Sequence, residues 1–315
     1  RDTIIWLILM KVVVTPPAVY KSESLKSKLS SLFPNTVYNQ NTNYLSGEEL
    51  MDFLKDADAA IIGRDPVTQD TLDALPQLKM ISKYGVGLEN LDLNAIKQRG
   101  IELAVTTGIN KRSVAELTLS FMVGLCHNIF ISAERMKRGE WIREGGQDLS
   151  GKTIGIIGCG NVGKEVIKIL KPFGCKILIN DIEDRSKFCR EQGAIESSFE
   201  LLIKESDIVS LHVPLTNLTR DMINHNVLKD MKANAFLVNT SRGPVVNSSH
   251  LHRALVSKEI LGAALDVFCS EPPDDIEFLQ LPQLMVTPHI GGNSIEAVEA
   301  MGQGAIDNLL KYFNK

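Results

Sequence analysis

The chain has 315 residues, which is long enough for two domains that each bury a core of their own. Hydrophobic residues make up 44% of it, charged residues 23%, and the formal net charge is −4, so we expect neither a nucleic-acid-binding nor a membrane-binding surface. The five cysteines are odd in number and lack the spacing of metal ligands, which favours a reduced, cytoplasmic compartment and no metal site.

The chain begins with an apolar run that we do not expect to be functional. Residues 4–9 are apolar, but the run is far below the roughly 18 residues that span a bilayer. It also lacks a basic leader and a small-residue cleavage site, so no secretion signal is predicted. We interpret Met10 as the natural start and residues 1–9 as an N-terminal extension.

Residues 11–106 alternate between short apolar runs and amphipathic segments, which predicts an α/β domain. Ser46 is expected to cap one of the helices. Two of the predicted strands end in loops with basic residues, Gly63-Arg64-Asp65 and Lys83-Tyr84-Gly85-Val86-Gly87. Strands are expected at 11–15, 37–38, 59–62 and 80–82, and helices at 22–33, from 46 onward and at 68–74.

The next segment, residues 113–131, is predicted to be one long apolar helix. Such a helix would carry the chain from the first domain into the second, and an ordinary core helix would have the same pattern. Residues 139–151, which include Trp141, are expected to form a loop.

Residues 152–181 have the pattern of a strand, a glycine-rich loop, a helix and a second strand. Strands at 153–157 and 176–180 flank the loop Gly158-Cys159-Gly160-Asn161-Val162-Gly163 and the helix after it. Gly158 permits a tight turn, Gly160 lets a pyrophosphate approach the backbone, and Gly163 lets the helix pack on the strand. Because a helix N-terminus also offers free N–H groups and partial positive charge, the segment predicts a dinucleotide site.

Asp181 follows the second of these strands, where a carboxylate would accept both ribose hydroxyls of an adenosine. A 2′-phosphate would face its negative charge, so the sequence predicts NAD rather than NADP. Arg185 is close enough in sequence to weaken this preference.

Beyond Asp181 the alternation continues, which gives enough strands for a doubly wound parallel sheet. Polar clusters follow the last three predicted strands, and in such sheets ligands bind at this edge. These clusters contain Arg242, Glu271 and His289. Helices are expected at 186–192 and 198–204, and strands at 208–213, 237–239, 263–267 and 285–287.

An arginine, a carboxylate and a histidine beside a nicotinamide suit the reduction of a 2-keto acid. The arginine can bind the substrate carboxylate through two N–H donors, and the histidine can exchange a proton with the carbonyl oxygen. The carboxylate can hold the histidine tautomer and stabilise its imidazolium. Most single arginines and histidines are structural or solvated, so the prediction depends on the joint pattern.

From residue 11 onward the chain closely resembles the D-isomer-specific 2-hydroxyacid dehydrogenase family. The motifs stand in the family's order: GCGNVG with Asp181, LHVPLT at 211–216, VNTSRGPVV at 238–246, AALDVFCSEPP at 263–273 and TPHIGG at 287–292. The resemblance implies an α/β fold of two Rossmann-like domains, with doubly wound parallel sheets and a cleft between the domains. It also implies an NAD-dependent oxidoreductase that interconverts a D-2-hydroxy acid and its 2-keto acid.

The resemblance assigns roles to individual residues. The implied catalytic residues are Arg242, Glu271 and His289, with Glu271 paired to His289, and Asp266 is implied to contact the nicotinamide amide. The implied cofactor-binding residues are Gly158, Gly160, Asn161, Val162, Gly163, Asp181, His212, Pro214, Thr240, Ser241, Arg242, Asp266, His289, Gly291 and Gly292. The implied substrate-binding residues are Arg64, Lys83, Val86, Gly87, Arg242 and His289.

Members of the family have a discontinuous first domain. Residues 10–107 and 290–315 are therefore expected to form the substrate-binding domain, to which the C-terminal helix returns, and residues 108–289 the NAD-binding domain. The family also implies a homodimer formed through the NAD-binding domain, with the long helix and the Trp141 loop as contributors.

Substrate identity is the least determined part of the prediction. Arg64 and Lys83 can hold a phosphate, and within the family the chain is most similar to a short D-3-phosphoglycerate dehydrogenase without a regulatory domain. The same two residues can instead be solvated charges, which makes glyoxylate or hydroxypyruvate reduction the nearest alternative. A dinucleotide-sensing corepressor resembling the C-terminal binding protein is a remote alternative. A methyltransferase would leave the arginine, glutamate and histidine clusters unexplained.

Overall fold

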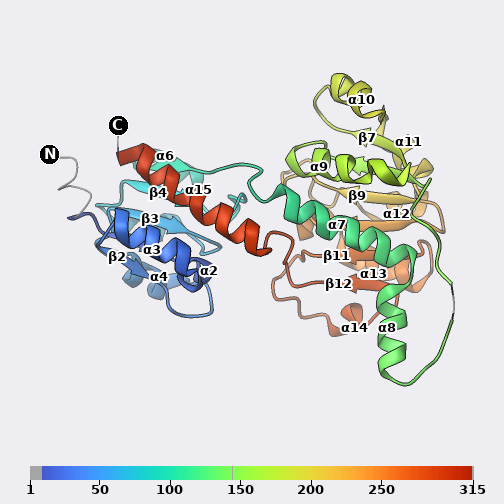
Figure 1. Cartoon of the computed structure of the whole chain (residues 1–315), viewed down its shortest axis with the longest axis horizontal. Helices are drawn as coiled ribbons and strands as arrows, with labels where there is room; N and C mark the ends of the chain where they lie inside the picture. Colours follow the sequence, from blue (N-terminus) through green and yellow to red (C-terminus); the bar gives the residue numbers. More distant parts are fainter. Residues whose placement is uncertain (1–8, 144, 314–315) are drawn as a thin grey trace. The chain divides into compact units, whose positions relative to one another are not determined.

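The computed structural model describes residues 9–143 and 145–313 of the chain. These residues form two compact units, each built on a parallel β-sheet with packed helices (Figure 1). Within the described residues, unit 1 comprises residues 9–110 and 292–313, and unit 2 comprises residues 111–143 and 145–291. The predicted α/β class with two parallel sheets is confirmed. The boundaries predicted after residues 107 and 289 fall a few residues before these divisions. The predicted extension, 1–9, lies outside the described residues except for Leu9.

Unit 1 contains a five-stranded sheet in the order β2-β1-β3-β4-β5. Three of its strands, 12–14, 59–62 and 80–83, are buried along their whole length, as expected for a parallel sheet covered on both faces, and the first two are purely aliphatic. The elements are β1 (Val12–Val14), α2 (Pro17–Lys21), α3 (Glu23–Leu32), β2 (Thr36–Tyr38), α4 (Gly47–Leu54), β3 (Ala59–Ile62), α5 (Gln69–Asp73), β4 (Met80–Lys83), α6 (Leu93–Gln98), β5 (Glu102–Ala104) and α15 (Ile295–Phe313).

The C-terminal helix α15 packs on unit 1 against α2, α3 and β4. The Ser82 hydroxyl on β4 donates to the carbonyl of Ala305 at 2.8 Å, which ties the helix to the sheet. One expectation for unit 1 is corrected: α4 begins directly after Ser46, but the Ser46 side chain makes no capping hydrogen bond. The acidic side chains of Glu48 and Glu49 in the first turn still stabilise the N-terminus of α4, because they interact favourably with the helix dipole.

Unit 2 contains a seven-stranded parallel sheet in the order β12-β11-β10-β9-β6-β7-β8, with β6 near the point where the strand order reverses. Ile157 of β6 faces one core, and Ile154 and Ile156 face the other, so both faces of the sheet are covered. The elements are α7 (Lys111–Cys126), α8 (Ile129–Lys137), β6 (Thr153–Ile157), α9 (Asn161–Leu170), η1 (Lys171–Phe173), β7 (Lys176–Asn180), α10 (Ser186–Gln192), β8 (Ile195–Glu196), α11 (Phe199–Glu205), β9 (Ile208–Leu211), α12 (His225–Asp230), β10 (Phe236–Asn239), η2 (Gly243–Val245), α13 (Ser248–Val256), β11 (Gly262–Leu265), α14 (Ile276–Leu279) and β12 (Leu284–Val286).

The single helix predicted over residues 113–131 is wrong. The chain forms two helices, α7 and α8, which are bent by 67° at the break between them (Figure 1). Asn128 stands at this break with a left-handed φ of 55°, a conformation that interrupts a right-handed helix. In the described part of the chain, no helix by itself is long and apolar enough to cross a bilayer, and α7 and α8 meet that test only as a bent pair.

Candidate functional site

The glycine-rich loop between β6 and α9 has open space beside one of its three motif glycines. Gly158 has a φ of +91°, and a Cβ there would lie 2.6 Å from the His212 carbonyl oxygen. A Cβ on Gly163 would lie 2.2 Å from the Gly158 carbonyl oxygen. A Cβ on Gly160, in contrast, would meet no atom within 4 Å. Because Gly160 caps α9, this open space adjoins helix N–H groups that have no intrahelical partner, which fits a pyrophosphate.

Asp181 follows β7 and is tied to the glycine-rich loop. Its Oδ2 accepts the N–H of Cys159 at 2.6 Å, and its Oδ1 accepts the N–H of Glu183 at 2.9 Å. The Arg185 guanidinium lies 3.3 Å from Oδ2 and also contacts Glu183 at 2.6 Å. Burial alone would raise the pKa of the Asp181 carboxyl, but the two N–H donors and Arg185 outweigh it and lower the pKa. An ionised acceptor therefore stands where a ribose is expected.

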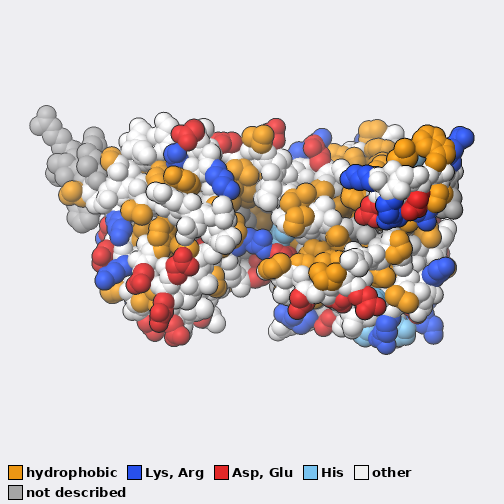
Figure 2. Space-filling model, turned by 90° about the horizontal axis from the view of Figure 1, so that it is seen from below, with side chains coloured by type: hydrophobic (Ala, Val, Ile, Leu, Met, Phe, Trp, Pro, Cys, Tyr) orange, Lys and Arg blue, Asp and Glu red, His pale blue; other side chains and the backbone are white. Residues whose placement is uncertain are grey.

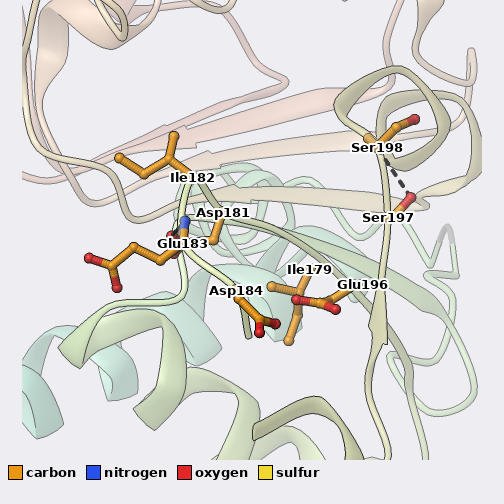
Figure 3. Close-up of a pocket in the computed structure, with 8 residues that line it drawn as sticks. All are labelled: Ile179, Asp181, Ile182, Glu183, Asp184, Glu196, Ser197 and Ser198. Atoms are coloured by element: carbon orange, nitrogen blue, oxygen red, sulfur yellow. Dashed lines mark hydrogen bonds between the residues drawn. The ribbon is translucent and has the colours of Figure 1, made fainter. Parts of the chain in front are cut away.

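A pocket of about 390 Å³ opens beside Asp181, at the ends of β7 and β8 (Figure 3). Four of its eight lining residues are acidic: Asp181, Glu183, Asp184 and Glu196. A 2′-phosphate in this pocket would be repelled by these carboxylates, whereas free ribose hydroxyls would find acceptors. The pocket fits NAD, as the sequence predicts.

The loops after β11 and β12 bring His289 and Glu271 together. The Nδ1 of His289 lies 2.8 Å from Oε2 and 3.0 Å from Oε1 of Glu271, and the Phe268 N–H donates to the same carboxylate at 3.2 Å. A proton on Nδ1 satisfies this contact and leaves Nε2 as the nitrogen that can exchange a proton with a substrate. Both side chains are partly exposed, at 33% for His289 and 21% for Glu271, so a substrate can reach them.

Arg242 lies in a turn at the end of the neighbouring strand, β10. The side chain of Asn239 shapes this turn, because its Nδ2 donates to the Arg242 carbonyl at 2.9 Å and its Oδ1 accepts the N–H of Ser241 at 3.0 Å. The Arg242 Nη1 donates to the Ser241 carbonyl at 2.7 Å. A Cβ on Gly243 would lie 2.0 Å from the Phe268 backbone, so the turn packs directly on the loop that leads to Glu271.

Asp266 is 1% exposed and binds the loop that carries His289. Its Oδ1 accepts the Thr287 hydroxyl at 2.6 Å and the Ile290 N–H at 2.8 Å, and its Oδ2 accepts the Gly291 N–H at 2.8 Å. Through these contacts Asp266 has a structural role, which is to hold the loop that carries His289. Its contact with a nicotinamide amide stays a prediction.

Asn161 and Val162 begin α9, and three further predicted cofactor residues, His212, Pro214 and Thr240, lie in the loops after β9 and β10. His212 Nε2 is 3.0 Å from the Ser210 hydroxyl, while its Nδ1 is buried without a hydrogen-bond partner among the described residues. Burial lowers the pKa of His212 to about 3, so this imidazole is neutral. Thr240 is buried beside Thr118 of α7, with 2.8 Å between the hydroxyl oxygens. The Pro214 carbonyl accepts the Thr219 hydroxyl at 2.6 Å.

Unit 1 contains the predicted substrate residues Arg64, Lys83, Val86 and Gly87. The backbone N–H groups of Val86 and Gly87 are half-buried and donate to no acceptor in the part of the chain that the structure describes, which fits a carboxylate ligand. The Arg64 guanidinium is exposed and lies 5.9 Å from the centre of the Tyr44 ring.

Lys83 is not the solvated charge that the alternative interpretation expects, because the residue is only 4% exposed. Its Nζ donates to the carbonyl of Gly63, which also accepts the Asn90 side chain at 3.2 Å. Lys83 therefore holds the Gly63-Arg64-Asp65 loop in place.

Two residues that shape the site were not predicted from the sequence. The sequence does contain a signal for Asn239, since this polar residue ends a buried strand directly before the polar cluster. Ser113 donates to the Gly291 carbonyl at 2.6 Å, and no local pattern marks this contact because the two residues are 178 positions apart.

Comparisons with known proteins agree with this geometry. The sequence model described as "D-isomer specific 2-hydroxyacid dehydrogenase, NAD binding domain" matches residues 119–291. The chain is 34% identical to the hydroxypyruvate reductase of Thermotoga maritima over 93% of its own length and 97% of that protein. It is 37% identical to the D-3-phosphoglycerate dehydrogenase of Methanocaldococcus jannaschii over 85% of its own length, and spans 52% of that protein.

A solved structure of a 2-hydroxyacid dehydrogenase also matches the fold of this chain. The D-lactate dehydrogenase of Aquifex aeolicus, complexed with NAD and lactic acid, matches with a TM-score of 0.85 at 26% identity and covers 96% of this chain and 95% of its own. The chain therefore belongs to the D-isomer-specific 2-hydroxyacid dehydrogenase family, whose members are NAD-dependent oxidoreductases that act on CH–OH donors.

Proposed function

We propose that the chain reduces hydroxypyruvate, or the smaller keto acid glyoxylate, with Arg242, Glu271 and His289 as its catalytic residues. The observation that carries the proposal is the His289–Glu271 pair, in which the carboxylate holds Nδ1 of a partly exposed imidazole and so assigns proton transfer to Nε2. Bound NADH would supply the hydride, and bound NAD would accept it in the reverse direction.

In this proposal the protein groups bind and polarise the keto acid. The Arg242 guanidinium binds the substrate carboxylate with two donors. The Nε2 of His289 donates a proton to the carbonyl oxygen as the hydride arrives. Glu271 then stabilises the transient imidazolium charge through Nδ1.

The choice of substrate rests on Lys83 and on the relatives. A phosphate site built from Arg64 and Lys83 needs both cations, but Lys83 is buried and bound to the Gly63 carbonyl. The relative named hydroxypyruvate reductase also matches this chain almost end to end. The second candidate is 3-phosphohydroxypyruvate, the first choice from the sequence, which the exposed Arg64 guanidinium favours.

The test is NADH oxidation with hydroxypyruvate, glyoxylate, pyruvate and 3-phosphohydroxypyruvate. We expect the highest kcat/KM with hydroxypyruvate, and a His289→Ala variant should lose roughly two to four orders of magnitude in kcat while it still binds NADH. Near-normal turnover of His289→Ala would contradict the catalytic assignment. A preference for 3-phosphohydroxypyruvate that disappears in Arg64→Gln, but not in the control Lys97→Gln of the same unit, would establish the second candidate.

We also propose a cytoplasmic location and a homodimer. The location is supported by the five cysteines, all of which are free thiols. The homodimer is supported by exposed hydrophobic side chains on unit 2.

A further inference from the structure

His289 has a backbone conformation that is uncommon for a residue with a side chain. Its φ is +55°, in the left-handed region that residues other than glycine rarely adopt. The His289 N–H donates to the Thr287 carbonyl at 3.0 Å, so the turn is tight. Such a conformation persists only when surrounding contacts stabilise it, and the direction of the imidazole depends on it.

The peptide groups that follow His289 are held from two sides. On one side, the buried Asp266 carboxylate accepts the N–H groups of Ile290 and Gly291, both at 2.8 Å. On the other side, the Ser113 hydroxyl donates to the Gly291 carbonyl at 2.6 Å. Asp266 and Ser113 therefore fix both polar groups of the Gly291 residue, two positions after the imidazole.

Ser113 is well placed for this task because α7, which carries it, is firmly anchored. The helix packs against α9, β10 and β11 within unit 2. One turn further along, Thr118 donates to the Val114 carbonyl at 2.8 Å and contacts the Thr240 hydroxyl at 2.8 Å. Helix α7 thus supports two of the loops at the edge of the sheet where the catalytic side chains lie.

We propose that Ser113 is a positioning residue that acts through the Gly291 carbonyl to aim the His289 imidazole. The inference rests on the proposed role of His289 as the proton carrier. Loss of the hydroxyl leaves the carbonyl without this donor and lets the left-handed turn relax. Because a displacement of about 1 Å can cost on the order of a hundredfold in rate, a smaller shift should still lower kcat measurably.

The experiment compares Ser113→Ala with Ser113→Thr and with Ser120→Ala. Ser120 is a matched control, because it lies on the same helix and its hydroxyl donates at 2.8 Å to the Glu116 carbonyl of that helix. We expect Ser113→Ala to lower kcat about tenfold while the KM for NADH changes less than about twofold, since the phosphate loop is untouched. Ser113→Thr should restore most of kcat, and Ser120→Ala should match the parent protein.

A double-mutant cycle separates positioning from a general effect on the fold. If Ser113 acts through His289, then Ser113→Ala should add no further loss to the residual turnover of His289→Ala. A further tenfold loss in that background would overturn the inference, as would an unchanged kcat in Ser113→Ala alone or a parallel loss of NADH affinity. An active His289→Ala would instead refute the proposed function, so the two failures are distinguishable.

Discussion

At the residue level, we propose that Asp181 and Arg185 set the choice between NAD and NADP. The carboxylate is held ionised by two backbone N–H groups, and the guanidinium beside it is shared with Glu183. Arg185 therefore does not cancel the acidic character of the pocket in Figure 3, which contains Asp184 and Glu196 as well. The negative charge explains why the pocket fits a ribose rather than a 2′-phosphate.

We expect Asp181→Ala to raise the KM for NADH by about tenfold and to reduce the preference for NADH over NADPH, because the ribose loses its acceptor and Arg185 loses one of its two carboxylate partners. The measurement is the ratio of kcat/KM for the two cofactors. Asp230→Ala, which removes an acidic residue at the end of α12, is the control and should leave the ratio unchanged. An unaltered ratio in Asp181→Ala would exclude the ribose contact.

At the scale of secondary structure, the glycines of the β6–α9 unit have different tasks. Gly163 allows the helix to approach the loop, since its missing Cβ would lie 2.2 Å from a backbone oxygen. Gly160 faces open space, so its missing side chain matters for a ligand and not for packing. The two positions can therefore be separated by alanine substitution.

We expect Gly163→Ala to lower the free energy of unfolding of the cofactor-free protein by about 1–3 kcal/mol, the usual cost of overpacking. Gly160→Ala should change this free energy by less than about 1 kcal/mol, yet weaken NADH binding at least tenfold, because the new methyl group occupies the space expected for the pyrophosphate. Urea unfolding without cofactor and a fluorescence titration with NADH measure the two quantities. Equal effects of both variants on unfolding would show that our division of roles is wrong.

The elements of the fold were predictable where a single local pattern determines them. The strands β3, β6 and β7 lie at their predicted positions, because each is an aliphatic run bounded by turn residues. The break between α7 and α8 was not predictable from periodicity, since apolar residues continue through it and only the left-handed Asn128 interrupts the helix. The short helices α6 and α12, of six residues each, were not predicted from the sequence.

The candidate site was predictable as a set of motifs but not as a set of contacts. Arg242, Glu271 and His289 each follow a strand, which is a local signal. The contacts that hold His289 come from Asp266 and Ser113, which are far from it in sequence and meet it only in the folded sheet. Lys83 was interpreted by its charge, and its burial beside Gly63 could be known only from the packing of two strands.

On the scale of the whole molecule, α8 and the loop after it expose an unusual number of hydrophobic side chains. Figure 2 shows the molecule from the side on which α8 lies in Figure 1, with hydrophobic side chains on unit 2 among charges of both signs. Helix α8 has no fully buried residue. The exposed residues of this surface are Ile129, Phe130, Met136, Trp141 and Ile142, with Trp141 at 74%.

An apolar surface of this kind indicates a partner, and a second copy of the chain fits the proposed homodimer. We expect the double variant Met136→Glu, Trp141→Glu to shift the protein from dimer to monomer in sedimentation velocity at micromolar concentration, because two charges would be buried without partners at each copy of the surface. Leu201→Glu on α11 is the control, since Leu201 has the same exposure as Met136, 53%, but lies outside this surface. A monomeric parent protein would refute the homodimer, and a dimer that survives the double variant would place the interface elsewhere.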